Sequence, residues 1–305
     1  MHFAFHIGAH KTATTSFQHS LRATSRSLRA AGVSVVGKRS KRYGRERYYS
    51  SIAPLLKRSY EPDEIKQLGK AAADALKEVC AEDKTHSVFL SDEAILGDMP
   101  GQMIGFYPQS HEILEEILNN LKPTSISISL VTRKQDSFIW SCYKQMYQLG
   151  RPLLLEEYLD RAKPQDANWH NFSTRLYNVV GNALSVTPYE NIKNVGGTLF
   201  FQEILNRSLP HLDTLPTLSS VGSSNISLDL KTMLNAMAMR AEGINTKEIQ
   251  MSVLNSRGND KSRMPNILSN TIMTLHNESN MKLFEQFIPQ HLPYKMGYTT
   301  NNHCS

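Results

Sequence analysis

The chain has 305 residues and a mass of 34.5 kDa, with 40% hydrophobic and 20% charged residues. This length and composition allow a large buried core, which argues against an intrinsically disordered protein. The formal net charge of +6 favours an anionic partner, and a nucleotide, an acidic glycan and a nucleic acid all meet that condition.

The cysteine pattern and the apolar runs narrow the class further. The three cysteines, Cys80, Cys142 and Cys304, have no metal-ligand spacing and form no even set, so we expect neither a zinc site nor a disulfide framework. No apolar run approaches the length of a membrane span, and the first motif already begins by residue 6, where a secretory signal would lie. We therefore expect a cytoplasmic protein with no transmembrane segment.

The first predicted element is a buried strand over residues 3–7. The polar stretch "GAHKTATTS" at 8–16 follows it, and a helix carrying Phe17, Leu21 and Leu28 comes next. A glycine-containing turn between a strand and a helix is typical of an anion site, because the free backbone N–H groups of the helix N-terminus are available to the ligand. This segment therefore predicts a phosphate-binding loop.

The loop differs from the Walker loop of nucleoside triphosphatases. The Walker pattern G-x-x-x-x-G-K-[ST] places its lysine after a second glycine. Here Lys11 follows Gly8 by three positions, no second glycine is present, and the hydroxyl side chains come after the lysine. Those hydroxyl donors belong to Thr12, Thr14, Thr15 and Ser16. We expect Lys11 to add a positive charge to the anion site.

The remaining elements alternate between strands and helices. Apolar and β-branched runs predict further strands at 33–36, 87–90, 126–132 and 184–187. Helical spacing predicts helices after Glu61-Pro62-Asp63 through Val79, over 112–121, and from Asp136 onward with Asp136 as the N-cap. This rhythm is typical of a parallel sheet covered by helices.

The chain changes character after about residue 210. A Ser-rich stretch leads into a Met-rich amphipathic segment at 228–240, ended by Gly243, whose methionines we interpret as core residues. We therefore expect an α/β fold with a P-loop-like parallel sheet flanked by helices and a helical C-terminal lobe. Residues 1–305 would form a single domain, with a core to about residue 210 and the lobe over about 211–305.

A second candidate site follows the strand predicted at 126–132. Arg133 lies at the C-terminal end of that strand, where the ligands of open α/β sheets collect, and Ser141 lies eight positions later. A guanidinium and a hydroxyl can converge on one phosphate, which the guanidinium binds in a bidentate manner. For this segment alone, a surface ion pair for Arg133 and a helix-face serine are the alternative.

Three segments together resemble a known family. The loop at 8–16, "RKQDSFIWSCY" at 133–143 and "VVGNALSVTPYE" at 179–190 are similar, in this order, to the sulfotransferases that use 3′-phosphoadenosine 5′-phosphosulfate (PAPS). The resemblance reaches from residue 3 to about 240. It implies that the 3′-phosphate is held by Arg133 and Ser141, and that no metal is needed. It also implies a 5′-phosphosulfate site formed by Lys11, Thr12, Ala13, Thr14, Thr15 and Ser16.

The chain departs from the family pattern at Ala13, where the family usually has glycine. If the φ angle there is positive, alanine costs about 1 kcal/mol or more, and if it is negative, alanine is harmless. The basic-glycine loop that closes over the 3′-phosphate in relatives would correspond to Arg257 and Gly258. A solvated loop is the alternative for these two residues.

The resemblance implies in-line transfer of the sulfuryl group to an acceptor hydroxyl, with Lys11 stabilising the leaving phosphate of 3′-phosphoadenosine 5′-phosphate (PAP). Some similar carbohydrate sulfotransferases use a glutamate as base, so Glu93 in "VFLSDEAIL" is the first candidate. Asp92 is the second candidate and His10 the third. A carboxylate that complements a helix dipole is the alternative for Glu93, and His6 is expected to be a core histidine.

Two further features remain open at this stage. The basic run "KRSKRYGRER" at 38–47 can guide an anionic acceptor or the nucleotide, or can be a solvated loop. One of the rings of Phe138, Trp140 and Tyr143 can stack on adenine, although core packing explains each of them as well.

We expect a PAPS-dependent sulfotransferase that acts on a hydroxyl of a small-molecule or glycan acceptor, more specifically a carbohydrate or glycolipid. A P-loop kinase or NTPase is the first alternative, because "VFLSDE" also resembles a strand ending in acids that support Mg²⁺. A non-catalytic nucleotide-binding protein is the second. No nucleic-acid motif is present, and the sequence assigns no oligomeric state.

Overall fold

The computed structural model describes residues 1–37, 48, 52, 60–102, 105–220, 228–256 and 262–299. Its centre is a five-stranded sheet in the order β2-β3-β1-β4-β5, and every neighbouring pair is parallel. The strands are β1 (His2–His6), β2 (Val33–Val36), β3 (Ser87–Ser91), β4 (Ser125–Thr132) and β5 (Leu184–Pro188). All five strands lie where the sequence predicts them, to within one residue at each end, and the α/β fold class is confirmed.

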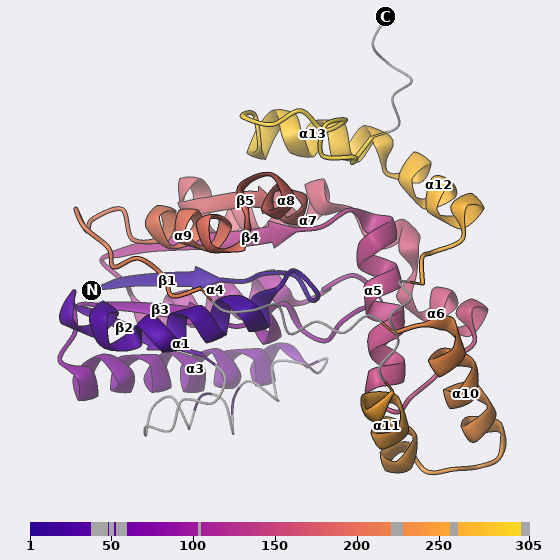
Figure 1. Cartoon of the computed structure of the whole chain (residues 1–305). Helices are drawn as coiled ribbons and strands as arrows, with labels where there is room; N and C mark the ends of the chain where they lie inside the picture. Colours follow the sequence, from indigo (N-terminus) through magenta and orange to yellow (C-terminus); the bar gives the residue numbers. More distant parts are fainter. Residues whose placement is uncertain are drawn as a thin grey trace, which may run out of the picture.

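Helices cover both faces of the sheet (Figure 1). On one face, α1 (Thr14–Ala30) and α9 (Gly197–Ser208) pack their apolar side chains around Phe17 against Ala4 of β1. On the other face, α3 (Pro62–Asp83), α4 (Ser110–Leu121) and α7 (Trp169–Val180) share a core with Phe3 and Phe5. Successive residues of β1 thus point to opposite layers, as a strand buried on both faces requires.

The helix boundaries follow local sequence signals. Pro62 begins α3, where a capping box joins Glu61 and Glu64, and α4 ends at Leu121, before Pro123. Both predicted helices are confirmed.

The predicted N-cap of the next helix is wrong. Helix α5 (Gln135–Gln148) begins after Lys134, so Asp136 lies inside the first turn. Its Oδ2 accepts a hydrogen bond from Ser269 Oγ at 2.6 Å, so a tertiary contact engages the carboxylate instead of a cap.

The C-terminal segment is helical, as expected. Beyond α6 (Leu155–Ala162) and the short α8 (Ile192–Val195) lie α10 (Leu230–Ala241), α11 (Thr246–Asn255), α12 (Asn266–Leu275) and α13 (Asn277–Phe287). Met233, Ile249, Ile272 and Leu283 of these helices belong to the same buried cluster as the sheet residues. This shared core favours a single domain, although the division at about residue 210 stays a prediction.

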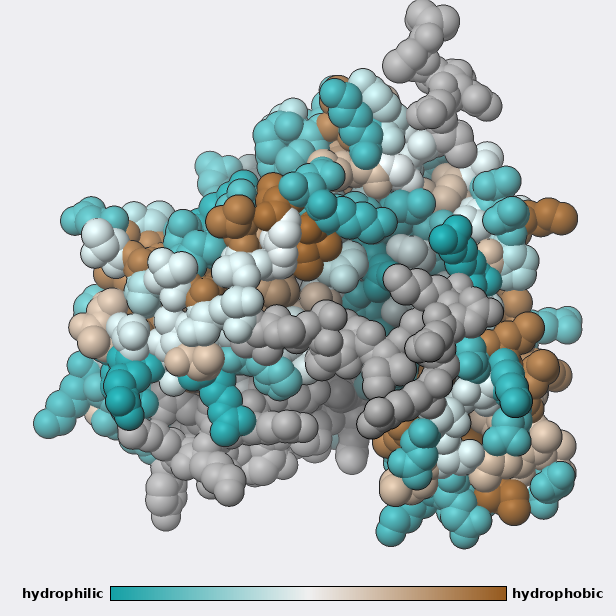
Figure 2. All heavy atoms as spheres, viewed as in Figure 1, coloured by the Kyte–Doolittle hydropathy of each residue, from teal (hydrophilic) through white to brown (hydrophobic). Residues whose placement is uncertain are grey.

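The surface of the C-terminal helices carries several exposed apolar side chains, and Figure 2 shows brown spheres over this part of the molecule. They are Leu230, Leu234, Met251, Leu254 and Ile267. In the described part of the chain, no helix combines the length and the apolar character that crossing a bilayer requires.

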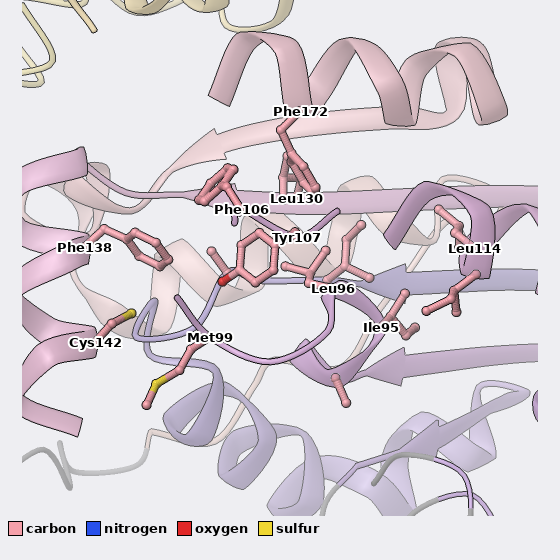
Figure 3. Close-up of a cluster of buried hydrophobic side chains, with 14 of the residues drawn as sticks. Ile95, Leu96, Met99, Phe106, Tyr107, Leu114, Leu130, Phe138, Cys142 and Phe172 are labelled. Carbon is pink, nitrogen blue, oxygen red and sulfur yellow. The ribbon is translucent and has the colours of Figure 1, made fainter. Parts of the chain in front are cut away.

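An aromatic cluster lies next to the carboxyl edge of the sheet. Figure 3 shows Phe106, Tyr107 and Phe138 grouped there, with Met99 and Cys142 beside them. Phe138 and Tyr143 are buried in this core, which favours packing over adenine stacking for both rings. The cluster therefore supports the segments that carry the candidate site.

Candidate active site

The loop after β1 continues the pairing with β4 and then turns sharply. Ile7 N–H donates to Ser129 O at 2.9 Å, and Ala9 N–H donates to Val131 O at 3.0 Å. The backbone then enters the left-handed region at Lys11 (φ 67°) and Ala13 (φ 61°), immediately before α1 begins. Within the described residues, the backbone N–H groups of 11–16 donate no hydrogen bond, so they are available to an anion.

Side chains around the loop fix its shape. Thr12 is buried, and its hydroxyl donates to Ala9 O at 2.6 Å. Arg133 Nη1 donates to the carbonyl oxygen of Lys11 at 2.6 Å, and Lys11 Nζ donates to Gln145 Oε1 at 2.8 Å. The Arg133 guanidinium, predicted from a separate motif, is therefore bonded to the backbone of the loop that carries Lys11.

Lys11 sits in a partly desolvated place. Burial lowers the pKa of Lys11, the nearby Arg133 guanidinium adds to this effect, and Glu93 opposes it. A weakly hydrated ammonium beside open N–H groups interacts strongly with an incoming anion.

A cavity of about 520 Å³ opens beside the loop, and we call it the loop cavity. Its lining includes His10, Lys11, Ala13, Thr14, Thr15 and Glu93. Thr14 Oγ1 is buried and has no hydrogen-bond partner in the described residues. A buried hydroxyl without a partner is costly, so its place in this lining fits a ligand that accepts a hydrogen bond.

Glu93 lines the loop cavity and comes from the segment that follows β3. It begins a short 3₁₀ helix, Glu93–Leu96, directly after β3, and its Oε2 accepts a hydrogen bond from Gln18 Nε2 at 3.5 Å. Gln18 also donates to Ser91 O at 2.8 Å, which holds that amide in place. Lys11 and Glu93, predicted from different segments, thus line one cavity.

The other two candidate bases have different surroundings. Asp92 is buried and is not part of the described lining of the loop cavity. Its Oδ1 accepts a hydrogen bond from Ala94 N–H and its Oδ2 accepts one from Tyr48 Oη, each at 3.0 Å. His10 lines the loop cavity, and its Nδ1 shares a hydrogen bond of 2.9 Å with Tyr107 Oη. Asp92 therefore caps the 3₁₀ helix, as an aspartate at an N-cap does.

His6, the last residue of β1, is a core residue, as the sequence predicts. Its Nδ1 lies 2.9 Å from Ser91 Oγ, and burial lowers its pKa to about 4. It therefore stays neutral at physiological pH and contributes packing rather than charge.

Arg133 lines a second cavity of about 430 Å³, and we call it the arginine cavity. Its described lining combines Arg133 and Ser141 with Lys144, Lys193 and Arg263. The Arg133 Nε donates to Ser137 Oγ at 3.1 Å, and its guanidinium carbon lies 5.1 Å from the ring centre of Tyr189. The arrangement concentrates positive charge where one arginine is already oriented.

Sequence reasoning missed three of these cations. Lys144 lies three residues after Ser141 on α5, so helical periodicity could have indicated it. Burial lowers its pKa to about 8, with Arg133 and Lys11 adding to the shift. Lys193 and Arg263 come from segments far apart in the chain, and no local pattern points to them.

The other predicted residues are placed as follows. Trp140 lines the arginine cavity, and its Nε1 donates to Ser262 O at 2.9 Å. Ser16 is buried and is absent from the described lining of the loop cavity. The predicted Arg257 and Gly258 and the basic run 38–47 lie outside the described residues. No group of three or more His, Cys, Asp or Glu side chains among the described residues is arranged to hold a metal ion.

Comparisons with known proteins give little further guidance. No family model matches the chain, and no curated protein sequence matches it. Among solved structures, the chain is similar to a crystal structure of a sulfotransferase from Alicyclobacillus acidocaldarius, with 13% sequence identity and a TM-score of 0.47. The likeness covers 95% of this chain and 97% of that chain. At this degree of similarity, no activity follows from the likeness, and function depends on the side chains of the two cavities.

Proposed function

We propose that this chain is a PAPS-dependent sulfotransferase that transfers a sulfuryl group to an acceptor hydroxyl. One observation carries the proposal: the hydrogen bond of 2.6 Å from Arg133 Nη1 to the Lys11 carbonyl, which joins a residue of the arginine cavity to a residue of the loop cavity. A nucleotide with a phosphate at the 3′ position and another at the 5′ position could place one phosphate beside Lys11 in the loop cavity and the other beside Arg133 in the arginine cavity. A nucleoside triphosphate carries its phosphates in a single chain, which would need only one such cavity.

The loop cavity is the proposed site of the 5′ group. Lys11 and the open N–H groups of 11–16 would bind the anion, and Thr14 Oγ1 would gain the partner that it lacks. The nucleotide, when bound, supplies an activated sulfuryl group. Lys11 stabilises the negative charge that grows on the leaving phosphate, and Gln145 Oε1 holds the ammonium toward the cavity.

The arginine cavity is the proposed site of the 3′-phosphate. The Arg133 guanidinium offers several N–H donors in a planar fork, a geometry that suits phosphate. Ser141 adds a hydroxyl, and Lys144, Lys193 and Arg263 add charge. The Tyr189 ring beside the guanidinium limits its orientation.

Glu93 is the proposed general base. It is a carboxylate in the lining of the loop cavity beside Lys11, and it can accept the proton of an acceptor hydroxyl held there. Gln18 orients its Oε2. Asp92 is less suited because Ala94 and Tyr48 engage both of its oxygens, and His10, whose Nδ1 bonds to Tyr107 Oη, stays the third candidate.

A carbohydrate or glycolipid acceptor and a cytoplasmic location stay predictions that rest on the sequence and its resemblance alone. The first alternative function, a P-loop kinase or NTPase, differs in its nucleotide and in its need for Mg²⁺. The second, a non-catalytic nucleotide-binding protein, differs in turnover.

PAP binding tests the cofactor site. We expect wild-type protein in a chelator to bind PAP in isothermal titration calorimetry, and Arg133→Ala to weaken binding by about tenfold or more, because a charged hydrogen-bonding fork is lost. Arg26→Ala, an exposed arginine of α1, is the matched control and should bind as wild type. Absence of PAP binding together with Mg²⁺-dependent ATP binding would replace the proposal with the kinase alternative.

Turnover tests the base. Glu93→Gln should keep PAP affinity but lower the release of PAP from PAPS, in the presence of a glycan panel, by roughly 10²–10⁴-fold, as loss of a general base does. Glu285→Gln, an exposed site on α13, controls for loss of a carboxylate. Unchanged turnover in Glu93→Gln would remove Glu93 as base while leaving the nucleotide site intact.

A further inference from the structure

A third cavity, of about 250 Å³, adjoins the loop cavity, and we call it the side cavity. Gln102 and Arg151 line both cavities, so the two share a wall. Two further arginines, Arg161 and Arg240, line the side cavity. The side cavity therefore gathers three arginines from separate parts of the chain next to the proposed transfer centre.

Close backbone packing forms this side cavity. Gly150, at the end of α5, has a φ of +69°, and a Cβ there would lie 2.0 Å from the Thr246 carbonyl oxygen at the start of α11. Gly101 likewise has a φ of +91°, and a Cβ there would lie 2.3 Å from the Tyr158 ring of α6. Only glycine permits these approaches, so the walls that carry the arginines are fixed by tight contacts.

The charge of the side cavity is only partly compensated. Arg240 Nη1 donates to Glu157 Oε2 and to Pro152 O, each at 2.9 Å, and Arg161 also acts on Glu157. The Arg151 guanidinium has no hydrogen-bond or ion-pair partner among the described residues. No aspartate or glutamate occurs in the described lining of the side cavity. One carboxylate thus faces three guanidinium groups, which leaves positive charge for a ligand.

The neighbouring loop cavity, unlike the side cavity, has carboxylates in its described lining. Glu93 and Asp98 are both part of that lining. An acceptor with an anionic group would be repelled from these carboxylates and attracted to Arg151. These charges would therefore orient an acceptor that has a hydroxyl at one end and a negative charge at the other.

Building on the proposed sulfotransferase function, we propose that the acceptor is anionic. Its carboxylate, sulfate or phosphate group binds Arg151, assisted by Arg161 and Arg240, while its hydroxyl lies in the loop cavity near Glu93 and Lys11. Arginine suits all three anions because its planar fork binds two oxygens at once. Arg151 is then a specificity-determining residue rather than a catalytic one.

Paired probes test this proposal on PAP-saturated protein. The first pair is p-nitrophenyl β-D-glucoside and p-nitrophenyl β-D-glucuronide, and glucose is compared with its 6-sulfate and its 6-phosphate. We expect at least one acidic probe to bind about tenfold tighter than its neutral partner, which is the value of a charged hydrogen bond. The carboxylate, sulfate and phosphate arms identify which anion is preferred.

The variants locate the preference. Arg151→Ala should remove it, while Arg26→Ala should keep it. Each variant is saturated with PAP at its own measured affinity before the probes are added, because Arg151 also lines the loop cavity. High ionic strength should reduce the preference, because an exposed guanidinium is screened. Equal binding of acidic and neutral probes, no binding of any probe, or a preference that survives Arg151→Ala would each overturn the proposal.

The two proposals fail in different ways. If PAP does not bind, the proposed sulfotransferase function fails. The same probe titrations on ligand-free protein still report whether the side cavity selects anions. If PAP binds and the probes show no anion preference, only the acceptor class is wrong.

Discussion

Two residues of the loop between β1 and α1 adopt backbone conformations that L-amino acids with a side chain rarely use. Lys11 and Ala13 have φ angles of 67° and 61°. Because the φ of Ala13 is positive, an alanine at this position carries a conformational cost that a glycine would not. Each such non-glycine residue costs roughly 1–2 kcal/mol. The loop holds this strain next to the N–H groups that it leaves open.

Replacing Ala13 by glycine should relieve strain. Relief of roughly 1–2 kcal/mol is offset by about 0.4–1 kcal/mol of added unfolded-state entropy, so Ala13→Gly should leave the free energy of unfolding unchanged or raise it by up to about 1.6 kcal/mol. Ala71→Gly, in the middle of α3, should lower it by about 1 kcal/mol. Urea denaturation measures both. Equal losses in the two variants would show that Ala13 is not strained.

The residues of the candidate site fall into two groups: those that a local sequence pattern indicates, and those that only tertiary packing brings to the site. Lys11, Arg133 and Glu93 follow strand ends in recognisable segments, and parallel strands bring their carboxyl ends to one edge of the sheet. Ser141 lies eight positions after Arg133, on α5. The sequence could therefore indicate these four together. Lys193, Arg263 and the arginines of the side cavity reach their positions through tertiary packing, and such contacts leave no periodic trace in one sequence.

Among the elements, the pair α3 and α4 shows how one glycine sets a helix contact. A Cβ at Gly69 would lie 2.5 Å from Glu116 Cβ and 2.9 Å from the Glu116 carbonyl carbon. The backbone of α3 at Gly69 thus packs directly against Glu116 of α4. Any residue larger than glycine at position 69 would push the two helices apart. The contact holds α4 against the layer that supports β3 and Glu93.

Gly69→Ala should therefore destabilise the protein although alanine favours a helix. We expect a loss of roughly 1–3 kcal/mol in the free energy of unfolding, as overpacking causes. Gly197→Ala is the matched control: a Cβ at this first residue of α9 meets nothing nearer than Ile192 Cδ1 at 4.0 Å. It should be neutral or raise stability by about 0.5 kcal/mol. A stable Gly69→Ala variant would contradict the close packing.

Element positions were predictable where the signal is local, and one boundary shows the limit. The strands at 33–36 and 87–91 follow from short β-branched and apolar runs. The start of α5 differs from its prediction because Asp136, a natural N-cap by type, bonds instead to Ser269 from α12. That partner is 133 residues away in the chain, and capping rules consider only neighbours.

At the scale of the whole molecule, several buried histidines make the fold sensitive to acid. His6 ends the central strand β1, and burial lowers its pKa to about 4. Burial also lowers the pKa of His2, whose Nε2 donates to Ser208 O, and of His276, whose Nε2 donates to Pro164 O. These histidines belong to the sheet and to the junction of α12 and α13, so both parts of the molecule share the effect.

The sign of the pH dependence follows from these shifts. The unfolded chain binds protons to these histidines near pH 6.5, whereas the folded protein excludes them, so the stabilisation is complete above pH 6.5 and is lost as pH falls.

His6 alone should lower the free energy of unfolding by about 2 kcal/mol between pH 7 and pH 5. Urea denaturation across that range measures the slope. His6→Gln should flatten the slope by about this amount, with denaturation at pH 8 as the check that the variant folds. A wild-type profile that is level from pH 7 to pH 5 would mean that these rings are not held neutral by burial.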